Sequence, residues 1–264
     1  ARDGLRGAEI NMRGKHGSTV LGTGNIMMAA VLAKGQSIIE GAALEPEVID
    51  LANFLNAMGA NIEGAGTRTI VIEGVEELGG AEHVVIPDRI EAGTFLVAGA
   101  LAGDDVILEN VCNAHMTELI NFLRQSGHQV NELTGDRLQI SSGSDLRGND
   151  LVTGPYPEFA TDMQAQVCAL CATTPGISVV TETIFPQRFM HVPELNRMGA
   201  NIRMEDSTAI IKGVERLSAA PVMASDLRAS AALVVAGLGA EGTTEVNRLY
   251  HIDRGYENID DKLK

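Results

Sequence analysis

A short amphipathic helix that ends in glycine recurs along this chain, and this repetition limits the fold more than any other feature of the sequence. Its copies are Leu51–Gly59, Leu119–Gly127 and Leu195–Gly199, so the terminal glycines stand 68 and 72 residues apart. Glycine readily adopts the left-handed conformation that ends many helices. We therefore expect the three glycines to cap three equivalent helices.

Each copy continues with the same order of strands and helices. Hairpin return strands rich in Thr and β-branched residues are predicted at Thr69–Ile72, Arg137–Ile140 and Thr208–Ile211. Helices that are apolar almost all round, and so should be buried, are predicted at Asn25–Leu32, Thr94–Leu101, Met163–Cys171 and Ala229–Gly237. Strands are predicted after three of these helices, at Ser37–Ile39, Asp105–Leu108 and Thr244–Val246.

The repeated unit is therefore strand, buried helix, strand, outer helix, strand, strand, and about four copies are present, the last incomplete. This order predicts an α/β fold with helices inside and sheets outside, in threefold sets. Pro87-Asp88-Arg89 follows the acidic stretch Glu73–Glu77 and begins the second copy. We place a domain boundary there, between residues 1–86 and residues 87–264.

The charge of the chain restricts its partners. The formal net charge is −15, which should repel nucleic acid and anionic lipid. No apolar run reaches the roughly 18 to 20 residues of a membrane span. We therefore expect neither a nucleic-acid nor a membrane partner. An anionic substrate would have to be bound by local Arg and Lys side chains and by helix N-termini.

Three cysteines, Cys112, Cys168 and Cys171, form an odd, low count that is typical of a reducing cytoplasm. The last two have CxxC spacing but lie inside the predicted buried helix, which favours core cysteines over redox or metal chemistry. Because no second CxxC or clustered His accompanies them, we expect no metal site and no cofactor.

Three charged residues stand in or beside loops next to apolar runs: Asp162, Arg228 and Arg254. Asp162 suits either a helix N-cap or a carboxylate that accepts a hydroxyl proton. For Arg228 the alternative is an exposed residue at a helix start, where a cation opposes the dipole unless an anion is bound nearby. Arg254 either pairs with an adjacent acid or clamps a carboxylate or phosphate.

A second candidate is the glycine-rich segment Gly14–Gly24, which opens a buried helix. Its backbone N–H groups, with Lys15, Ser18 and Thr19, suit a diphosphate, and a simple loop and helix cap is the alternative. The segment is not a Walker A loop, because no Gly-Lys-Ser/Thr stands at the helix start.

Three further residues are ambiguous. Phe185 lies in a loop beside Pro186 and either covers the core or packs against a ligand ring. His191 reads as a structural His with satisfied hydrogen bonds. Glu45 precedes Pro46 at a helix start, where acids complement the dipole.

Together these segments resemble the UDP-N-acetylglucosamine enolpyruvyltransferases, or 1-carboxyvinyltransferases. The resemblance runs through the whole chain and corresponds to the C-terminal three-fifths of such enzymes. The runs that carry it are Glu45–Leu55, Ile86–Glu91, Thr161–Gln166, Arg188–Leu195 and Tyr250–Glu257.

The resemblance implies an enolpyruvyltransferase-type inside-out α/β barrel fold with two domains of three repeats each. Residues 1–86 would be the last repeat of the first domain, and residues 87–264 would form the second, incomplete at its C-terminus. The implied cytoplasmic reaction moves the enolpyruvyl group of phosphoenolpyruvate to the 3-hydroxyl of UDP-N-acetylglucosamine. Phosphate leaves through a tetrahedral addition–elimination intermediate, in the first committed step of peptidoglycan synthesis.

Matching motifs imply a role for each candidate residue. Asp162 would be the base at the sugar hydroxyl, Arg254 would bind phosphoenolpyruvate, and Arg228 would support the anionic intermediate. The diphosphate would lie on a segment that includes Lys15, Gly17, Ser18, Thr19 and Val20. Ile184 and Phe185 would line the nucleotide-sugar site, and Glu45 belongs to the matching Glu-Pro-Glu motif. No protein partner is implied.

The chain also departs from the family pattern. The Lys-Asn pair near the family's N-terminus and the mobile loop with the catalytic Cys are missing, and none of the three cysteines replaces the latter. The chain begins with Ala1, and Asp260–Lys264 reads as an unfinished helix, so both ends suggest a piece of a longer protein. We expect the piece to be inactive alone. Two alternatives remain: a shikimate-pathway enolpyruvyltransferase, and a non-catalytic fragment that binds a nucleotide sugar.

Overall fold

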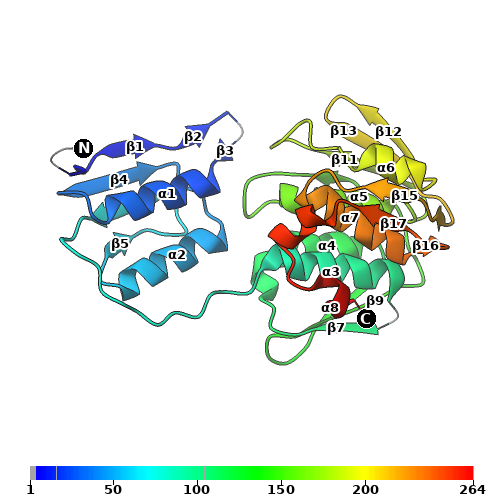
Figure 1. The fold of residues 1–264 in the computed structure, drawn as a ribbon, viewed down its shortest axis with the longest axis horizontal. Helices are drawn as coiled ribbons and strands as arrows, with labels where there is room; N and C mark the ends of the chain where they lie inside the picture. The colour runs from blue at the N-terminus through cyan, green and yellow to red at the C-terminus, as the bar shows by residue number, and fades with distance from the viewer. Residues whose placement is uncertain (1–3, 16, 104, 264) are drawn as a thin grey trace. The chain divides into compact units, whose positions relative to one another are not determined.

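The computed structural model describes residues 4–15, 17–103 and 105–263. Ala1, His16 and Lys264, which entered the sequence analysis, lie outside these residues. The chain divides into two compact units (Figure 1). The first unit is Ala1–Ile86 with Pro155–Pro157, and the second is Pro87–Gly154 with Glu158–Lys264.

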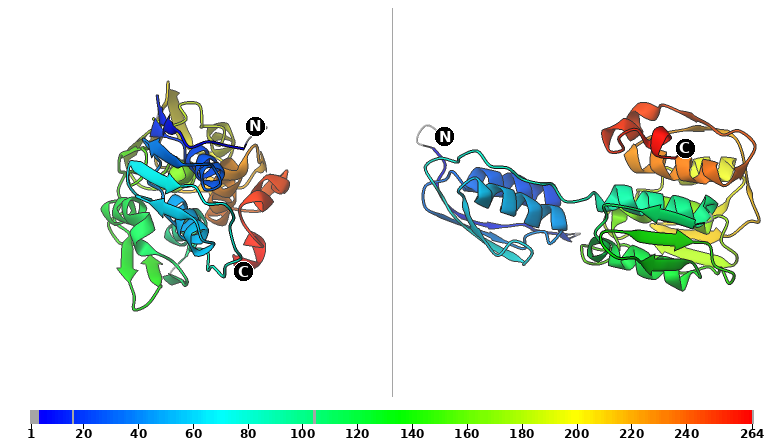
Figure 2. Two further views of the ribbon diagram at one scale, coloured as in Figure 1. Left: turned by 90° about the vertical axis from the view of Figure 1, so that its left-hand side faces the viewer. Right: turned by 90° about the horizontal axis from the view of Figure 1, so that it is seen from below.

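The first unit contains one complete copy of the repeat. Its four-stranded sheet has the order β1-β4-β6-β5, in which β1 and β4 run parallel and the other pairs are antiparallel. Both helices, α1 and α2, lie side by side on one face of this sheet (Figure 2, right). The elements are β1 (Glu9–Asn11), α1 (Val20–Ala30), β4 (Gln36–Glu40), α2 (Pro46–Ala57), β5 (Asn61–Glu63) and β6 (Thr69–Glu73). A short hairpin of β2 (Arg13–Gly14) and β3 (Gly17–Ser18) precedes α1.

The second unit begins with a copy built on a three-stranded antiparallel sheet of order β7-β9-β8. Its elements are α3 (Arg89–Ala102), β7 (Asp105–Leu108), the 3-10 helix η1 (Asn113–Met116), α4 (Thr117–Gln125), β8 (Gln129–Glu132) and β9 (Leu138–Ser141). The next copy has a four-stranded sheet of order β10-β11-β13-β12, the same mixed pattern as in the first unit. Its elements are β10 (Leu151–Val152), η2 (Thr161–Met163), α5 (Gln164–Cys171), β11 (Ile177–Thr181), α6 (Val192–Arg197), β12 (Asn201–Glu205) and β13 (Thr208–Lys212).

The last copy is built on two short parallel strand pairs, β14 with β16 and β15 with β17. Its elements are β14 (Leu217–Ser218), β15 (Pro221–Met223), α7 (Leu227–Leu238), β16 (Ala240–Glu241), β17 (Glu245–Asn247), η3 (Leu249–Arg254) and α8 (Ile259–Lys262).

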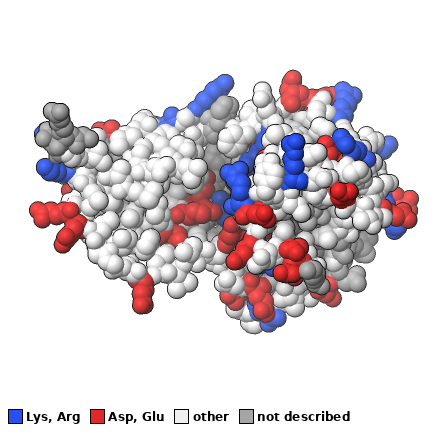
Figure 3. Space-filling model, in the orientation of Figure 1, with Lys and Arg blue, Asp and Glu red and all other residues white. Residues whose placement is uncertain are grey.

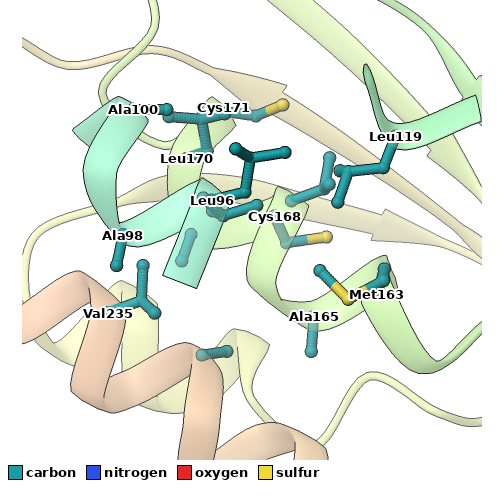
Figure 4. Packing of buried hydrophobic residues seen from close by; sticks show 14 of the residues in the cluster. Leu96, Ala98, Ala100, Leu119, Met163, Ala165, Cys168, Leu170, Cys171 and Val235 are labelled. Atoms are coloured by element: carbon teal, nitrogen blue, oxygen red, sulfur yellow. The ribbon is translucent and has the colours of Figure 1, made fainter. Parts of the chain in front are cut away.

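The core of the second unit lies among its three apolar helices, α3, α5 and α7, which pack on one another. Small and medium side chains such as Leu96, Ala100, Cys168 and Val235 interdigitate there (Figure 4). Every residue of α5 is buried. The predicted arrangement of helices inside and sheets outside is therefore confirmed for this unit.

The predicted glycine caps are also confirmed. Gly59, Gly127 and Gly199 have φ values of 102°, 98° and 90°, in the left-handed region. At each helix end the amide of the glycine bonds three residues back, and the next amide bonds five residues back, as Ala200 does to Leu195 at 3.0 Å. This is the Schellman arrangement, which satisfies the last carbonyl groups of a helix.

Two expectations about the elements were wrong. The first apolar helix is not buried all round, because α1 exposes Leu21 and Met28 while Met27 and Ala30 face the core. A strand also follows the third apolar helix: β11, which was not predicted, pairs with β13 through its whole length.

Candidate functional site

Asp162 lies in η2, at the start of the buried helix α5, and is held by two arginines. Its Oδ1 is 2.8 Å from Nη2 of Arg188 and 3.2 Å from Nε of Arg228. The side chain of Asp162 remains 34% exposed, so it faces solvent as well as its partners. The N-cap residue of η2 is Ala160, and the side chain of Asp162 therefore does not cap this helix, contrary to the structural alternative.

The charge of Asp162 is stabilised by this geometry. Burial raises the pKa of the carboxyl, but the Arg228 and Arg188 guanidinium groups outweigh that effect and hold the pKa below its ordinary value. Asp162 is thus an ionised carboxylate at neutral pH, and the pair of arginines is the cause.

Arg228 stands in the first turn of α7, where the side chain of Asp226 caps the helix by accepting from the amides of Arg228 and Ala229. Burial disfavours the charge of Arg228, but Asp162 and the hydroxyl of Tyr256 raise its pKa above the usual value. The cation at this helix start is therefore balanced by side chains of the protein.

Tyr256 anchors Arg228 from inside the second unit. Its hydroxyl shares a hydrogen bond of 2.8 Å with Oγ1 of Thr94, and Nε2 of Gln166 donates to the same threonine at 3.0 Å. Tyr256, Thr94 and Gln166 are all buried. A polar network thus runs from the exposed edge of Asp162 into the core between α3, α5 and η3.

Arg188 was missed as a site residue by the sequence analysis. It follows Phe185 in the same loop, its guanidinium carbon lies 5.2 Å from the centre of the Phe185 ring, and Nη1 donates to Thr161 at 3.2 Å. Phe185, Arg188 and their neighbours also line an open hollow of about 610 Å³. The sequence contained one sign of its role: Arg188 is a cation three residues after the loop aromatic Phe185, in a chain with a net charge of −15.

Arg254, at the end of η3, is not brought to Asp162. It is exposed, and its side chain makes no hydrogen bond or ion pair with any residue that the structure describes. Neither adjacent acid, Asp253 or Glu257, pairs with it. A cation with no partner among the described residues remains available to an anionic ligand.

The glycine-rich segment of the first unit forms the β2–β3 hairpin and the start of α1. Lys15 is exposed in the hairpin turn, Gly17 and Ser18 form β3, and Thr19 caps α1 by accepting from the amide of Gly22 at 3.2 Å. Val20 is the first helical residue. The expected cap is therefore present, and the first turn of α1 has no acidic residue that would oppose an anion.

Ser18 is tied to the sheet of the same unit. Its Oγ donates to the carbonyl of Gly41 at 2.5 Å and accepts from Nη1 of Arg68 at 3.3 Å. Arg68 is exposed and was not a candidate in the sequence analysis, because it lies 50 residues further along the chain. Lys15 and Arg68 thus give this hairpin a local positive charge.

The remaining candidates have structural positions. Glu45 is the N-cap residue of α2, which has Pro46 at its start, and Glu45 makes no side-chain capping bond.

Cys168 and Cys171 are free, buried thiols. Burial raises the pKa of both, to about 11 for Cys171, so they are core cysteines as expected. His191 is buried with its pKa lowered to about 4 by burial, and Nε2 lacks a partner among the described residues, so the expected satisfied His was wrong.

In the described part of the chain, no three His, Cys, Asp or Glu side chains are grouped so that they could hold a metal ion. No helix among these residues combines the length and the apolar character needed to cross a membrane. On the face drawn in Figure 3, most basic side chains of the second unit lie in its upper part, and acidic side chains gather in its lower part.

Curated relatives resemble the chain over nearly its full length. It is 65% identical over 262 residues to the UDP-N-acetylglucosamine 1-carboxyvinyltransferase of Akkermansia muciniphila. The matched residues make up 98% of this chain and 61% of that protein. The protein of the same name from Methylacidiphilum infernorum is 56% identical over 259 residues, with 98% and 61% covered. The chain thus spans about three-fifths of the length of these relatives.

Solved structures and a family model point the same way. The enolpyruvyl transferase NikO from Streptomyces tendae matches with a TM-score of 0.87 at 25% identity, over 98% of this chain and 64% of that chain. EPSP synthase from Acinetobacter baumannii matches with a TM-score of 0.73 at 21% identity, over 96% and 60%, and supports the fold alone. The family model described as EPSP synthase (3-phosphoshikimate 1-carboxyvinyltransferase) matches residues 2–263. The chain therefore belongs to the EPSP synthase family of enolpyruvyltransferases, as its sequence motifs predicted.

Proposed function

We propose that the protein to which this chain belongs transfers the enolpyruvyl group of phosphoenolpyruvate to the 3-hydroxyl of UDP-N-acetylglucosamine and releases phosphate. The observation that carries the proposal is the ionised carboxylate of Asp162, partly open to solvent and held at 2.8 and 3.2 Å by Arg188 and Arg228. The names of the relatives that are 52–65% identical support the choice of acceptor.

Asp162 is the proposed general base. Its carboxylate accepts the proton of the sugar hydroxyl while the hydroxyl oxygen bonds to C2 of phosphoenolpyruvate and C3 takes up a proton, which gives the tetrahedral intermediate. The bond between C2 and the phosphate oxygen then breaks, C3 gives up a proton, and the double bond between C2 and C3 re-forms. The proton removed from the hydroxyl balances the one that phosphate carries away, so Asp162 ends each cycle ionised.

The arginines of the second unit are the proposed electrostatic support. Arg228, fixed by Asp162 and Tyr256, offers a preorganised positive charge to the anionic intermediate. Arg254, which lacks a protein partner among the described residues, is the proposed ligand of phosphoenolpyruvate. Ile184 and Phe185, in the loop that lines the 610 Å³ hollow, are proposed contacts of the nucleotide sugar.

The hairpin and helix start of the first unit are a proposed diphosphate site. The N-terminus of α1, with no acid in its first turn, supplies backbone N–H groups and a favourable dipole. Ser18, Thr19 and Val20 provide this segment, and Lys15 and Arg68 add local positive charge. This local charge would overcome the unfavourable field of a chain with a net charge of −15.

The proposed cellular role is the first committed step of peptidoglycan synthesis, in the cytoplasm, with no cofactor and no metal. We also propose that this chain alone is inactive, because the family's Lys-Asn pair and catalytic Cys loop are not in it. The shikimate-pathway reaction has the same donor and a smaller acceptor, and a purely nucleotide-binding role needs no base at Asp162.

The test is phosphate release from phosphoenolpyruvate plus UDP-N-acetylglucosamine, by this chain and by the longer protein that extends upstream of it. We expect release only by the longer protein. Asp162→Asn in that protein should lower kcat at least a hundredfold, the range of general-base effects. The control is Asp136→Asn, the same change in an exposed turn, which should leave kcat unaltered.

The alternatives predict other outcomes. If shikimate 3-phosphate replaced UDP-N-acetylglucosamine as the better acceptor, the acceptor assignment would be wrong. If the folded longer protein bound the nucleotide sugar without any phosphate release, the transferase proposal would fail and a binding role would replace it.

A further inference from the structure

A buried carboxylate stands behind the candidate site in the second unit. Glu182 follows β11, is 1% exposed, and accepts four hydrogen bonds. No Lys or Arg of the described residues forms an ion pair with it. A buried carboxyl group without a cation is costly, and full hydrogen bonding is what makes it tolerable.

One oxygen of Glu182 organises the loop that carries Phe185. Oε1 accepts from the amides of Ile184 at 2.8 Å and Phe185 at 3.0 Å, and from Oγ1 of Thr153 at 2.7 Å. Thr153 in turn accepts from the amide of Thr183 at 3.0 Å. One carboxylate oxygen, from Glu182, and one hydroxyl, from Thr153, therefore fix the four consecutive residues Glu182–Phe185.

The other oxygen reaches Asp162 through two side chains. Oε2 accepts from Oγ1 of Thr161 at 2.8 Å, and that hydroxyl accepts from Nη1 of Arg188 at 3.2 Å. Nη2 of the same guanidinium lies 2.8 Å from Asp162. The hydroxyl of Thr161 donates its only proton to Glu182, so its lone pairs are free to accept from Arg188. Arg188 in turn holds the carboxylate of Asp162 in place.

Both side-chain oxygens of Glu182 must act as hydrogen-bond acceptors in this arrangement. A carboxylate accepts on both sides, whereas a glutamine would accept on one side and donate on the other. A donor facing Thr161 would reverse that hydroxyl and turn its proton towards Arg188, which cannot accept. A buried glutamate therefore fits this position better than glutamine, because hydrogen-bond donors face both of its side-chain oxygens.

We propose that Glu182 is a positioning residue that aligns Asp162, through Thr161 and Arg188, and holds the Phe185 loop through its other oxygen. The proposal rests on the proposed function in so far as Asp162 and Phe185 contact the substrates. It assigns the two arms to different steps: the Thr161 arm to proton transfer, and the Thr153 arm to nucleotide-sugar binding.

Two matched variants separate the arms. Thr161→Val and Thr153→Val each remove one hydroxyl that donates to Glu182, so a merely structural role predicts the same effect for both. In the longer protein, we expect Thr161→Val to lower kcat roughly 10- to 100-fold with KM for the nucleotide sugar within about threefold. Thr153→Val should raise that KM roughly 3- to 10-fold with kcat within about threefold. Thr161→Ser, which keeps the hydroxyl, should restore kcat.

Two readouts on this chain need no activity. Carboxyl NMR should show the titration midpoint of Asp162 moving up towards its ordinary value in Thr161→Val but not in Thr153→Val. Amide exchange at Ile184 and Phe185 should accelerate in Thr153→Val and in Glu182→Gln more than in Thr161→Val.

The positioning role would be overturned if both variants changed kcat and KM equally. It would also be overturned if the titration midpoint of Asp162 were unaltered in Thr161→Val and amide exchange were unaltered in Thr153→Val. Absence of phosphate release by the longer wild-type protein would overturn the proposed function instead. The titration and exchange results would still decide the role of Glu182 in that case.

Discussion

Tyr256 places a phenol hydroxyl inside the second unit, where two other polar side chains depend on it. Thr94 shares a hydrogen bond with it at 2.8 Å, and Nε2 of Gln166 lies 3.4 Å away. The same hydroxyl supports Arg228. The apolar core between α3 and α5 therefore contains a polar network at the back of the candidate site.

Replacing Tyr256 with Phe should destabilise the protein by about 1–3 kcal/mol, because Thr94 and Arg228 then lose a buried partner. Urea unfolding measures this difference. The matched control is Tyr250→Phe, since Tyr250 is 61% exposed, and its free energy of unfolding should change by less than about 0.5 kcal/mol. Equal stability of the two variants would contradict the network.

The charge on Asp162 predicts a specific pH dependence of stability. Its pKa is lower in the folded than in the unfolded chain, so its contribution is present above the ordinary aspartate pKa and is lost as pH falls through the folded value. We expect wild-type protein to exceed Asp162→Asn in stability at about pH 7, and the difference to shrink below about pH 4. Urea unfolding of the wild-type and Asp162→Asn proteins at several pH values tests this.

The sequence pointed to Asp162 and Arg228 as candidate site residues, but it did not show the contacts that join them. Asp162 followed by a helix fits an N-cap by residue type, yet capping depends on backbone conformation, and the extended residue here is Ala160. The partner Arg188 is brought to Asp162 by the path of the chain after β11, which the sequence analysis did not predict. Long-range ion pairs of this kind follow from tertiary packing, and local patterns do not contain them.

At the scale of single elements, the glycine caps were the most predictable feature, because one residue type answers one conformational need. The three caps nevertheless differ in their surroundings. A Cβ at Gly199 would meet no atom within 4 Å, whereas a Cβ at Gly127 would lie 2.2 Å from the carbonyl oxygen of Asp145. The φ values are similar, at 90° and 98°.

Gly199→Ala should therefore cost about 1–2 kcal/mol, the strain of a left-handed alanine. Gly127→Ala should cost about 1–3 kcal/mol more, because the backbone near Asp145 must also move. Both glycines belong to the second unit, so urea unfolding of one transition compares them directly. A larger loss in Gly199→Ala than in Gly127→Ala would contradict the packing around the second cap.

Helix boundaries were less predictable than helix caps. Three of the four apolar helices begin earlier than predicted, two of them at Arg89 and Leu227, because capping side chains such as Asp88 and Asp226 start them in polar sequence. The strand β11 was missed although four of its five residues, all but Ser178, are β-branched and Pro-Gly stands before it. Apolar periodicity locates the centres of elements better than their ends.

At the scale of the whole molecule, the two units bury their apolar helices differently. The helices α3, α5 and α7 of the second unit cover one another. By contrast, α1 covers only the sheet and α2 on one side, and its outer side carries Leu21, Met28 and, just beyond its end, Leu32. These side chains are 80%, 46% and 50% exposed. Leu21 and Met28 are seven residues apart and therefore lie on one face of the helix, and Leu32 follows in the turn after it.

This exposed apolar stripe predicts that the 264-residue chain self-associates as its concentration rises, because contiguous exposed apolar surface favours contact between copies. Replacing Leu21, Met28 and Leu32 together with Gln should suppress association in sedimentation velocity while changing the free energy of unfolding little, since no core contact is lost. The control is Met27→Gln on the opposite side of α1, which is fully buried, and which should destabilise the first unit without reducing association of the folded chain. A wild-type chain that stays monomeric at every concentration, with a cooperative unfolding transition, would show that the stripe is harmless. In that event the exposed side of α1 would need no cover to be stable in water, and its apolar character would have to be explained by helix propensity alone.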